Sequence, residues 1–357
     1  MQDLLGLSVR VSRLEELGFW PGKGCAVARL SPTSLLVLGR QSARETEYPP
    51  CCILTLMDTE DDTDSPPTTK THPNISIDLE ALQCPIPTDR AGFTATVVGP
   101  CVYVFGGRDK ASGHHNQMYI LDPGARLWTT VPLPPESEYL CDCKPGVCCE
   151  CATYPPQRSD HCAWPMGDRY LCITGGHGPS TYYRDMWVYD TQHVPIVPTV
   201  PTVPTVHGWT RPPHVAPHSM SGSVHGVVAE GEGEGEGEGV CHIIGGSQTV
   251  FTGCIGSGHF TLSAKAGWHR MPNPGLTTLH GAFLSTQRHI ILIGGDVHSS
   301  SLSVYDTVSG EWTRGADRGR VPTKLRDCKG CMLSPTLGIV VGEGVAIVIR
   351  VEEHEAE

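Results

Sequence analysis

A short apolar run that ends in glycine recurs along this chain, and it constrains the fold more than any other feature. The runs are rich in Val, Ile and Leu, and the glycines that first follow them are Gly39, Gly106, Gly175, Gly245, Gly294 and Gly342. Four of the six runs end in Gly-Gly. Such runs are typical of buried β-strands, and glycine lets the chain leave a strand with a positive φ. Six copies in 357 residues predict a repeat architecture.

Two further markers keep a regular spacing. An Asp precedes a Trp by six residues in two copies, from Asp122 to Trp128 and from Asp306 to Trp312. In three copies an Arg lies sixteen or seventeen residues before the first glycine: Arg90, Arg158 and Arg326. These spacings indicate that each repeat holds more than one strand.

In this order the markers resemble the kelch repeat. The fullest copy starts at Arg158-Ser159-Asp160-His161, continues through Gly175-Gly176 and Trp187-Val188-Tyr189-Asp190, and ends at Trp209. The resemblance covers nearly the whole chain. It implies an all-β fold, a six-bladed kelch-type β-propeller with four antiparallel strands in each blade.

The N-terminal run Leu7–Val11 alternates apolar and polar residues and belongs to no repeat. The last repeat, in turn, ends after its third strand at 345–349. We therefore predict that the N-terminal run supplies the missing outer strand and closes the ring, which leaves no unpaired edge; an unattached tail is the alternative. The predicted organisation is an N-terminal strand within residues 1–20 and a single propeller over residues 21–357.

The spacing between repeats predicts long loops. Three spacings are 67–70 residues and two are 48–49. We assign the additional residues of the longer repeats to insertions at residues 59–73, 136–157, 192–207 and 229–239. In the kelch family, the loops after Gly-Gly and the loops between blades share one face, which commonly binds partners. The resemblance implies that the Cys-rich insertion 136–157 lies on that face and the other three lie on the opposite face.

The charge balance limits the kind of partner. Asp and Glu number 38 against 26 Lys and Arg, a net charge of −12 at pH 7, whereas nucleic acids and anionic membranes attract positive surfaces. We expect neither as a partner. No run approaches 18 apolar residues, and the first residues lack the pattern of a secretory signal. We therefore expect a cytoplasmic location and reduced thiols.

The resemblance also suggests where a partner binds. Kelch domains commonly grip partner loops with arginines and small polar residues around the mouth of the channel. The residues that directly follow Gly-Gly are Arg108, His177, Ser247 and Asp296, and the arginines that open first strands are Arg90, Arg158 and Arg326. An arginine ring would suit an acidic peptide, because guanidinium binds carboxylate with two hydrogen bonds. A structural pair between blades is the alternative for these three arginines.

Five cysteines form the one dense set of possible metal ligands: Cys141, Cys143, Cys148, Cys149 and Cys151. Closely spaced thiolates can hold zinc, but the spacing does not match the usual C-x2-C knuckle, so a loop without metal is the alternative. Cys328 and Cys331 do have C-x2-C spacing. They open a first strand, where residues three apart point to opposite faces, so we do not expect them to share a ligand.

We expect a kelch-repeat scaffold, a monomer that binds a partner peptide or loop at the channel mouth. One alternative is a propeller enzyme that acts on a sugar or other small molecule at the same mouth. Another is a metal- or redox-responsive binder that uses the loop from Cys141 to Cys151. No Ser/His/Asp or paired-carboxylate pattern can be identified among the 17 histidines and 38 acidic residues, so the sequence indicates no catalytic residue and no cofactor beyond the possible zinc.

Overall fold

The computed structural model describes most of the chain. The described residues are 2–4, 7–13, 24–39, 51–58, 75–87, 89–134, 152–192, 208–213, 215–228, 239–247, 258–263, 267–272, 275, 279–295, 302–315, 325, 327–342 and 345–353. Within them every regular element is a β-strand.

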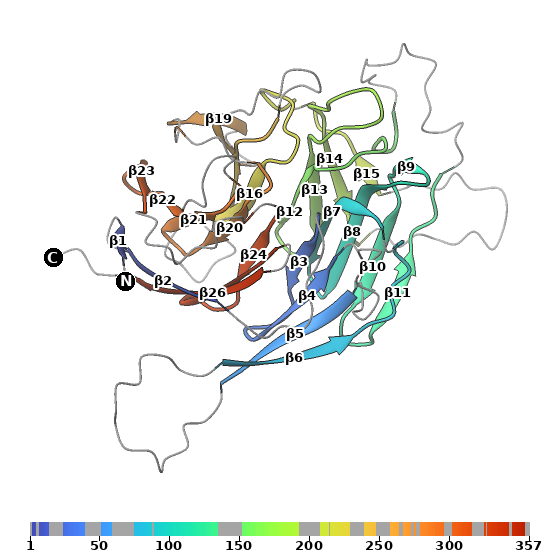
Figure 1. The fold of residues 1–357 in the computed structure, drawn as a ribbon. Helices are drawn as coiled ribbons and strands as arrows, with labels where there is room; N and C mark the ends of the chain where they lie inside the picture. Colours follow the sequence, from blue (N-terminus) through green and yellow to red (C-terminus); the bar gives the residue numbers. More distant parts are fainter. Residues whose placement is uncertain are drawn as a thin grey trace.

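The strands form six separate antiparallel sheets arranged around a centre, which is the β-propeller predicted from the repeats (Figure 1). Blade 1 has β3 (Ala26–Arg29), β4 (Ser34–Leu38), β5 (Cys51–Asp58) and β6 (Ile75–Ala81). Blade 2 has β7 (Ala91–Val98), β8 (Cys101–Asp109), β10 (Met118–Asp122) and β11 (Leu127–Thr130), with the short β9 (Gly113–His114) beside β8. Blade 3 has β12 (Cys162–Met166), β13 (Tyr170–Thr174), β14 (Met186–Asp190) and β15 (Trp209–Thr210).

The remaining blades follow the same order. Blade 4 has β16 (Val224–Val228), β17 (Val240–Ile244), β18 (His259–Ser263) and β19 (Gly267–Met271). Blade 5 has β20 (Ala282–Ser285), β21 (His289–Ile293), β22 (Leu302–Asp306) and β23 (Glu311–Arg314). Blade 6 has β24 (Lys329–Met332), β25 (Leu337–Gly342), β26 (Val345–Glu353) and β2 (Leu7–Arg13), with β1 (Gln2–Leu4) at its outer edge.

The apolar runs of the sequence are the second strands of the blades. In β17 and β21 all five residues are buried. A strand in this position is covered on both faces by the neighbouring blades, so it has no polar side, as in sheets buried on both faces. In blades 2 to 5 both glycines that follow this strand have positive φ, as the Gly-Gly pattern predicts.

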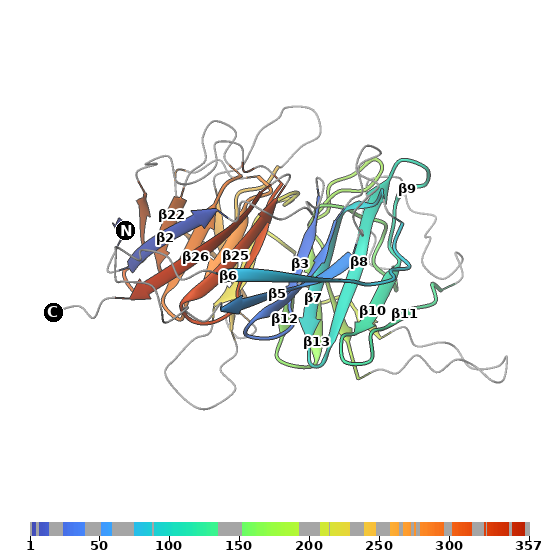
Figure 2. The same ribbon diagram turned by 60° about the horizontal axis from the view of Figure 1, so that its bottom comes forward.

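The N-terminal strand closes the ring. β2 pairs with β26 in antiparallel register from Leu7 opposite Glu353 to Arg13 opposite Ile347, and the two strands lie side by side in both views (Figures 1 and 2). The predicted closure is therefore confirmed. The pairing saturates one edge of β26 and joins the two ends of the chain in one sheet.

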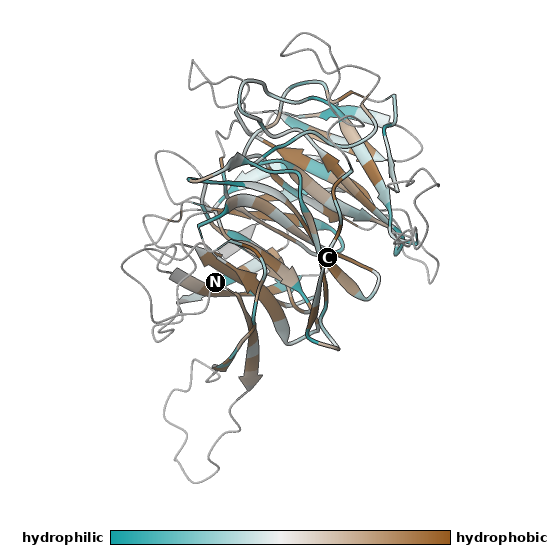
Figure 3. Cartoon of the chain, turned by 90° about the vertical axis from the view of Figure 1, so that its right-hand side faces the viewer, coloured by the Kyte–Doolittle hydropathy of each residue, from teal (hydrophilic) through white to brown (hydrophobic). Residues whose placement is uncertain are grey.

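The core lies between the blades. Six clusters of buried apolar residues form, one for each pair of neighbouring blades. The cluster between blades 6 and 1, for example, joins Ile339 and Val341 to Leu35 and Leu54. Figure 3 shows hydrophobic residues concentrated on the strands. The clusters run around the whole ring, so every blade is held by both neighbours.

The Asp and Trp markers lie on the outer strands. Tyr189 on β14 faces Trp209 on β15, and Tyr305 on β22 faces Trp312 on β23. The two rings of each pair are tilted against one another, with about 5 Å between their centroids. In blades 3 and 5 the Trp of the marker therefore makes a cross-strand aromatic contact that supports the register of the outer strands, whereas in blade 2 Leu121 faces Trp128.

Most of the predicted insertions lie outside the described residues: 59–73, 136–151, 193–207 and 229–238. The flanking strands show which connections contain them. Residues 59–73 lie between β5 and β6, and residues 229–238 lie between β16 and β17. No helix in the described part of the chain could span a membrane.

Candidate functional site

Six residues with positive φ form a ring at one end of the channel. Each stands at or just before the start of the first strand of its blade, and in blade order they are Gly24, Gly92, Asp160, Gly222, His280 and Asp327. Their φ angles lie between 52° and 75°. The ring lies at the blade end where the connections after Gly-Gly also emerge, because consecutive antiparallel strands place these connections on the same side. This is the binding face expected from the kelch resemblance.

Backbone hydrogen bonds join each ring residue to the next blade. The amides of Gly92, Asp160, Gly222 and His280 each donate to the carbonyl of the preceding ring residue, at 2.7–3.4 Å, and the amide of Cys328 donates to the His280 carbonyl at 3.0 Å. The thiol of Cys25 donates to the Asp327 carbonyl at 3.8 Å and completes the circle. The positive φ directs these groups around the channel, so the ring is a structural element with three side chains added to it.

None of the three ring glycines has space for a side chain, and a Cβ on Gly24 would lie 2.7 Å from the Ala91 Cβ. A Cβ on Gly92 would lie 2.7 Å from Asp160 Oδ1, and a Cβ on Gly222 would lie 2.6 Å from the imidazole carbon of His280. Asp160 and His280 therefore cover the neighbouring blade's glycine. Because each of these glycines leaves room for the side chain of the next blade, the ring of backbone hydrogen bonds stays unbroken and the polar side chains lie at its centre.

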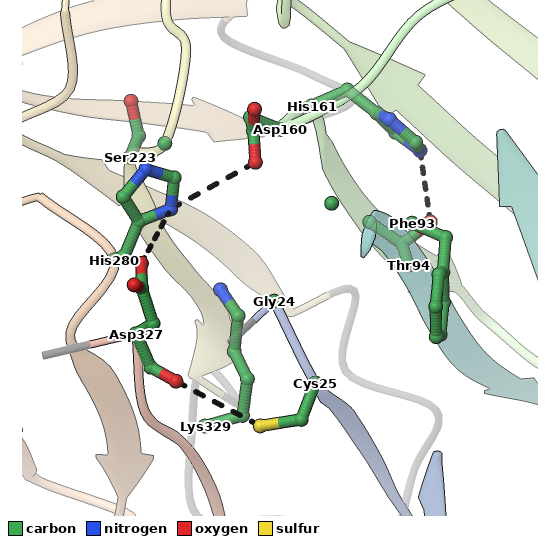
Figure 4. Close-up of a pocket in the computed structure, with 12 residues that line it drawn as sticks. Gly24, Cys25, Phe93, Thr94, Asp160, His161, Ser223, His280, Asp327 and Lys329 are labelled. Carbon is green, nitrogen blue, oxygen red and sulfur yellow. Dashed lines mark hydrogen bonds and ion pairs between the residues drawn. The ribbon is translucent and has the colours of Figure 1, made fainter. Parts of the chain in front are cut away.

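The three ring side chains meet in a small pocket at the channel mouth (Figure 4). His280 Nδ1 lies 3.9 Å from Asp160 Oδ1 and 3.9 Å from Asp327 Oδ1. The pocket has a volume of about 30 Å³ and is also lined by Lys329, whose side chain points into it in Figure 4. The side chains of Asp160, His280 and Asp327 remain 14%, 28% and 25% exposed, so they can reach a ligand from solvent.

A partly buried aromatic group stands beside the pocket. The ring of His177 stacks on Tyr182 at 5.4 Å between centroids, and the His114 ring meets His177 edge-on at 5.0 Å. His177 Nδ1 lies 2.9 Å from the Ser221 hydroxyl and 3.6 Å from Asp160 Oδ2. These contacts connect the aromatic group to the pocket. We call His114, His177 and Tyr182 the aromatic stack.

Burial lowers the pKa of His114 to about 4 and also lowers the pKa of His177. Nearby Asp160 opposes the shift at His177 but does not cancel it. Both rings are therefore neutral at neutral pH. The stack thus presents polarisable, uncharged rings, and the permanent charges nearby are those of Arg108 and the aspartates.

Three of the residues predicted to follow Gly-Gly occupy equivalent places around the mouth. Arg108 pairs with Ala91, and His177 and Ser247 form bridges with Ser159 and Ser221. In each case the partner directly precedes a ring residue. Arg108 is exposed, whereas His177 and Ser247 are partly buried. The fourth residue of this set, Asp296, lies outside the described residues.

Arg158, predicted at the mouth, is fully buried inside blade 3. Its guanidinium donates to both carboxylate oxygens of Asp185 at 2.8 and 2.7 Å and to the Gly175 carbonyl at 3.1 Å. It also lies 4.4 Å over the Tyr183 ring. These contacts favour a structural role, within one blade rather than between blades, and leave no donor directed at a partner.

Arg90 is also interior, at 4% exposure. It lies 3.7 Å from the Asp109 carboxylate and 5.8 Å from the Tyr119 ring centroid. Arg326 lies outside the described residues. Its neighbour Leu325, buried at 3%, occupies the position equivalent to Arg158, because the Leu325 carbonyl packs against Gly294 as the Arg158 carbonyl packs against Gly106. The predicted arginine ring is therefore reduced to Arg108 among the described residues.

The cysteines predicted as zinc ligands, from Cys141 to Cys151, lie outside the described residues. Within the described ranges no group of three or more His, Cys, Asp or Glu side chains is placed to hold a metal ion. The other thiol pattern behaves as expected. Cys328 packs between blades 5 and 6, while Cys331 packs between blades 6 and 1, so the two thiols lie on opposite faces of the sheet.

The ring side chains Asp160, His280 and Asp327 were not predicted from the sequence. A signal was present, because Asp160 in the Arg-Ser-Asp-His motif takes the place of Gly92 and Gly222 in other repeats. A chain position that alternates between Gly and Asp or His indicates positive φ, which these residues tolerate better than others. Without aligned repeats around His280 and Asp327, that signal is hidden by the variable loops.

The kelch markers, the six blades and the ring agree with the comparison to known families. The model of the KLHDC2/KLHL20/DRC7 Kelch-repeats domain matches residues 35–232, more than half of the chain. The chain belongs to the kelch-repeat family. Kelch-repeat propellers generally serve as protein–protein interaction modules.

Curated relatives match over a shorter region. The chain is 30% identical over 106 residues to acyl-CoA-binding domain-containing protein 5 of Arabidopsis thaliana, and 32% identical over 97 residues to acyl-CoA-binding domain-containing protein 6 of Oryza sativa subsp. japonica. The matches cover 30% and 27% of this chain but only 14% and 12% of those proteins. The similarity therefore concerns a small part of these relatives.

Proposed function

We propose that this kelch propeller binds a loop or peptide of a protein partner at the channel mouth. The observation that carries the proposal is the aromatic stack beside exposed Arg108 and the ring pocket. Tyr and Arg side chains supply much of the binding energy at protein interfaces, because they combine a large contact area with directed hydrogen bonds. Tyr182 and Arg108 present this combination on the face from which the loops after Gly-Gly emerge.

The ring pocket itself suits one side chain of a protein ligand better than a whole small-molecule substrate. Sites for small molecules usually enclose roughly 300–1,000 Å³, whereas the ring pocket measures about 30 Å³. A pocket of this size admits the tip of one side chain, while the rest of the partner lies on the surrounding surface. Four other expectations from the sequence stay predictions: an enzyme activity at the mouth, a zinc site in the Cys-rich loop, a cytoplasmic location and a monomeric state.

Affinity capture with variants of the mouth tests the proposal. Arg108→Glu and Tyr182→Ala should each reduce capture of the same specific partner by about tenfold or more, as expected for central interface residues. Val308→Glu is the matched control, because Val308 is 77% exposed in the turn between β22 and β23 on the opposite face. If the mouth variants retain the partner and the control loses it, the partner binds elsewhere.

A further inference from the structure

We propose that the ring pocket binds a single ammonium group from the partner, either the tip of a lysine side chain or an N-terminal amine. This inference rests on the proposed function, since it names the chemical group that the partner inserts. The proposed ligand is positively charged, whereas the predicted arginine ring suggested an acidic one. The difference arises because Arg90 and Arg158 lie in the interior while aspartates line the mouth.

The ring aspartates offer acceptor atoms that the protein leaves open. Asp160 Oδ1 and Asp327 Oδ1 are each 3.9 Å from His280 Nδ1, which is too long for a hydrogen bond. Among the described residues, neither oxygen has a hydrogen-bond donor. An ammonium group has three donors and no acceptor, so a carboxylate oxygen without a donor is a suitable partner for it.

His161, one of the residues that line the pocket, has a ring nitrogen without a partner among the described residues. His161 lines the pocket, is 3% exposed, and bonds through Nε2 to the Thr94 hydroxyl at 2.9 Å. Its Nδ1 is buried and has no hydrogen bond within the described part of the chain. Buried polar atoms are rarely left unpaired in folded proteins unless water or a ligand completes them. Burial holds the pKa of His161 well below its ordinary value, so the ring is neutral and adds no repulsion to a cation.

The volume selects among cations. A cavity needs roughly 10–15 Å³ to hold one water molecule, so about 30 Å³ accommodates a group the size of water or ammonium. The planar guanidinium of arginine is larger and needs a wider opening. A coordinated metal ion fits less well, because the described residues provide no set of three ligands in place.

The charge of Lys329 affects positive and negative ligands in opposite directions, so its removal tests the proposal. Its ammonium lines the same pocket, and it forms no ion pair within the described ranges. The carboxylates of Asp160 and Asp327 outnumber this single positive charge. Removal of the Lys329 charge should therefore strengthen the binding of an amine and weaken the binding of an acidic group.

The experiment titrates the full chain, labelled with ¹⁵N, with short peptides and follows amide shifts by NMR. One peptide is acetyl-Gly-Gly-Lys-Gly-Gly-amide, and its matched forms carry Nε-acetyl-lysine, arginine or glutamate at the centre. A Gly₅-amide with a free N-terminus tests the amine source. Asp160→Gly and Asp327→Gly are suitable variants, because glycine adopts the observed φ of 55° and 52° without strain. Asp168→Gly, in an exposed turn on the opposite face, is the control.

We expect the lysine peptide or the free N-terminus to shift amides around the ring, with the better binder identifying the source. Each ring variant should weaken binding about tenfold, as for the loss of a charge-assisted hydrogen bond, and Lys329→Met should tighten it. The arginine and acetyl-lysine forms should bind more weakly. Three results would each overturn the inference. The glutamate peptide could bind more tightly than the lysine peptide. Ammonium chloride could shift the ring amides while no peptide does, or Asp327→Gly could leave the affinity for the lysine peptide unchanged. If Arg108→Glu still abolishes partner capture while Asp327→Gly does not, the proposed function stands and the ammonium site is wrong.

Discussion

Arg158 and Asp185 form a two-bond salt bridge whose side chains are both fully buried, at 2.8 and 2.7 Å between nitrogen and oxygen. The indole of Trp187 donates to the same carboxylate at 2.7 Å. Burial alone would raise the pKa of Asp185, but the charge and hydrogen bonds of Arg158 outweigh it and lower that pKa. A residue that resembles a binding arginine in the sequence is therefore part of the structural frame of blade 3.

Removing one partner of this pair should strongly destabilise the protein. Arg158→Met leaves the Asp185 carboxylate buried without its counter-ion, which costs about 3–5 kcal/mol in comparable sites. Urea unfolding followed by tryptophan fluorescence measures the change. Arg169→Met is the control, since Arg169 pairs with Asp190 but is 45% exposed, and it should change stability far less. Equal effects from both variants would contradict the structural role of Arg158.

Acid should destabilise the packing between blades 4 and 5. His242 Nδ1 and His259 Nε2 are 2.9 Å apart in a buried pair. Burial lowers the pKa of His242 to about 4, and burial together with His242 lowers the pKa of His259 to about 3. Both pKa values lie below the value of 6.5 for an exposed imidazole. Below pH 6.5 the unfolded chain therefore binds protons that the folded protein does not.

The free energy of unfolding should fall as the pH drops from 6.5 to about 4, by up to about 1.4 kcal/mol per pH unit for each histidine. Chemical unfolding at a series of pH values measures this slope. His259→Asn should flatten it. Tyr305→Phe keeps the ring against His259 and adds no group that titrates in this window, so its slope should match that of the unchanged protein. A slope that is identical in all three proteins would refute the assignment.

The N-terminal strand should contribute directly to stability. Leu7 is fully buried in the cluster between blades 5 and 6, and its strand completes blade 6. Leu7→Ala should cost about 2–5 kcal/mol, the range for a buried Leu reduced to Ala. Arg10→Ala on the same strand should have a small effect. Thermal unfolding compares them, and a wild-type melting temperature for Leu7→Ala would show that the strand is not needed for closure.

The ring side chains should reduce stability. Asp327 has a φ of 52°, and the left-handed conformation costs roughly 1–2 kcal/mol for a residue with a Cβ. Asp327→Gly should therefore raise the free energy of unfolding by about 1 kcal/mol, since glycine's extra freedom in the unfolded chain offsets part of the gain. Asp78→Gly, on strand β6, should lower it. A loss of stability in Asp327→Gly would mean that the aspartate supports the fold.

The blades could be predicted from the sequence because their signals are local and repeated. Gly175-Gly176 and the pairing of Tyr189 with Trp209 reflect backbone conformation and cross-strand contact, which depend little on distant residues. The closure by Leu7–Arg13 was also predictable, because the last repeat lacked a strand. These features follow from hydrogen-bond pairing that every blade requires.

The candidate site was less predictable because burial depends on partners far along the chain. Nothing beside Arg158 in the sequence shows that Asp185 neutralises it. The pocket likewise brings Asp160, His280 and Asp327 together from blades 3, 5 and 6. The variable loops obscure the alignment of these repeats, so the convergence became visible only in three dimensions.

Site-specific photo-crosslinking tests the central claim most directly. A photoreactive amino acid would replace Arg108 or Tyr182 at the mouth, and, on the opposite face, Leu127 at the start of β11 or Val308 in the turn between β22 and β23. The account predicts crosslinks to one shared protein from the two mouth positions and none from the opposite face. Crosslinks to that protein from Leu127 and Val308, with none from the mouth positions, would contradict it.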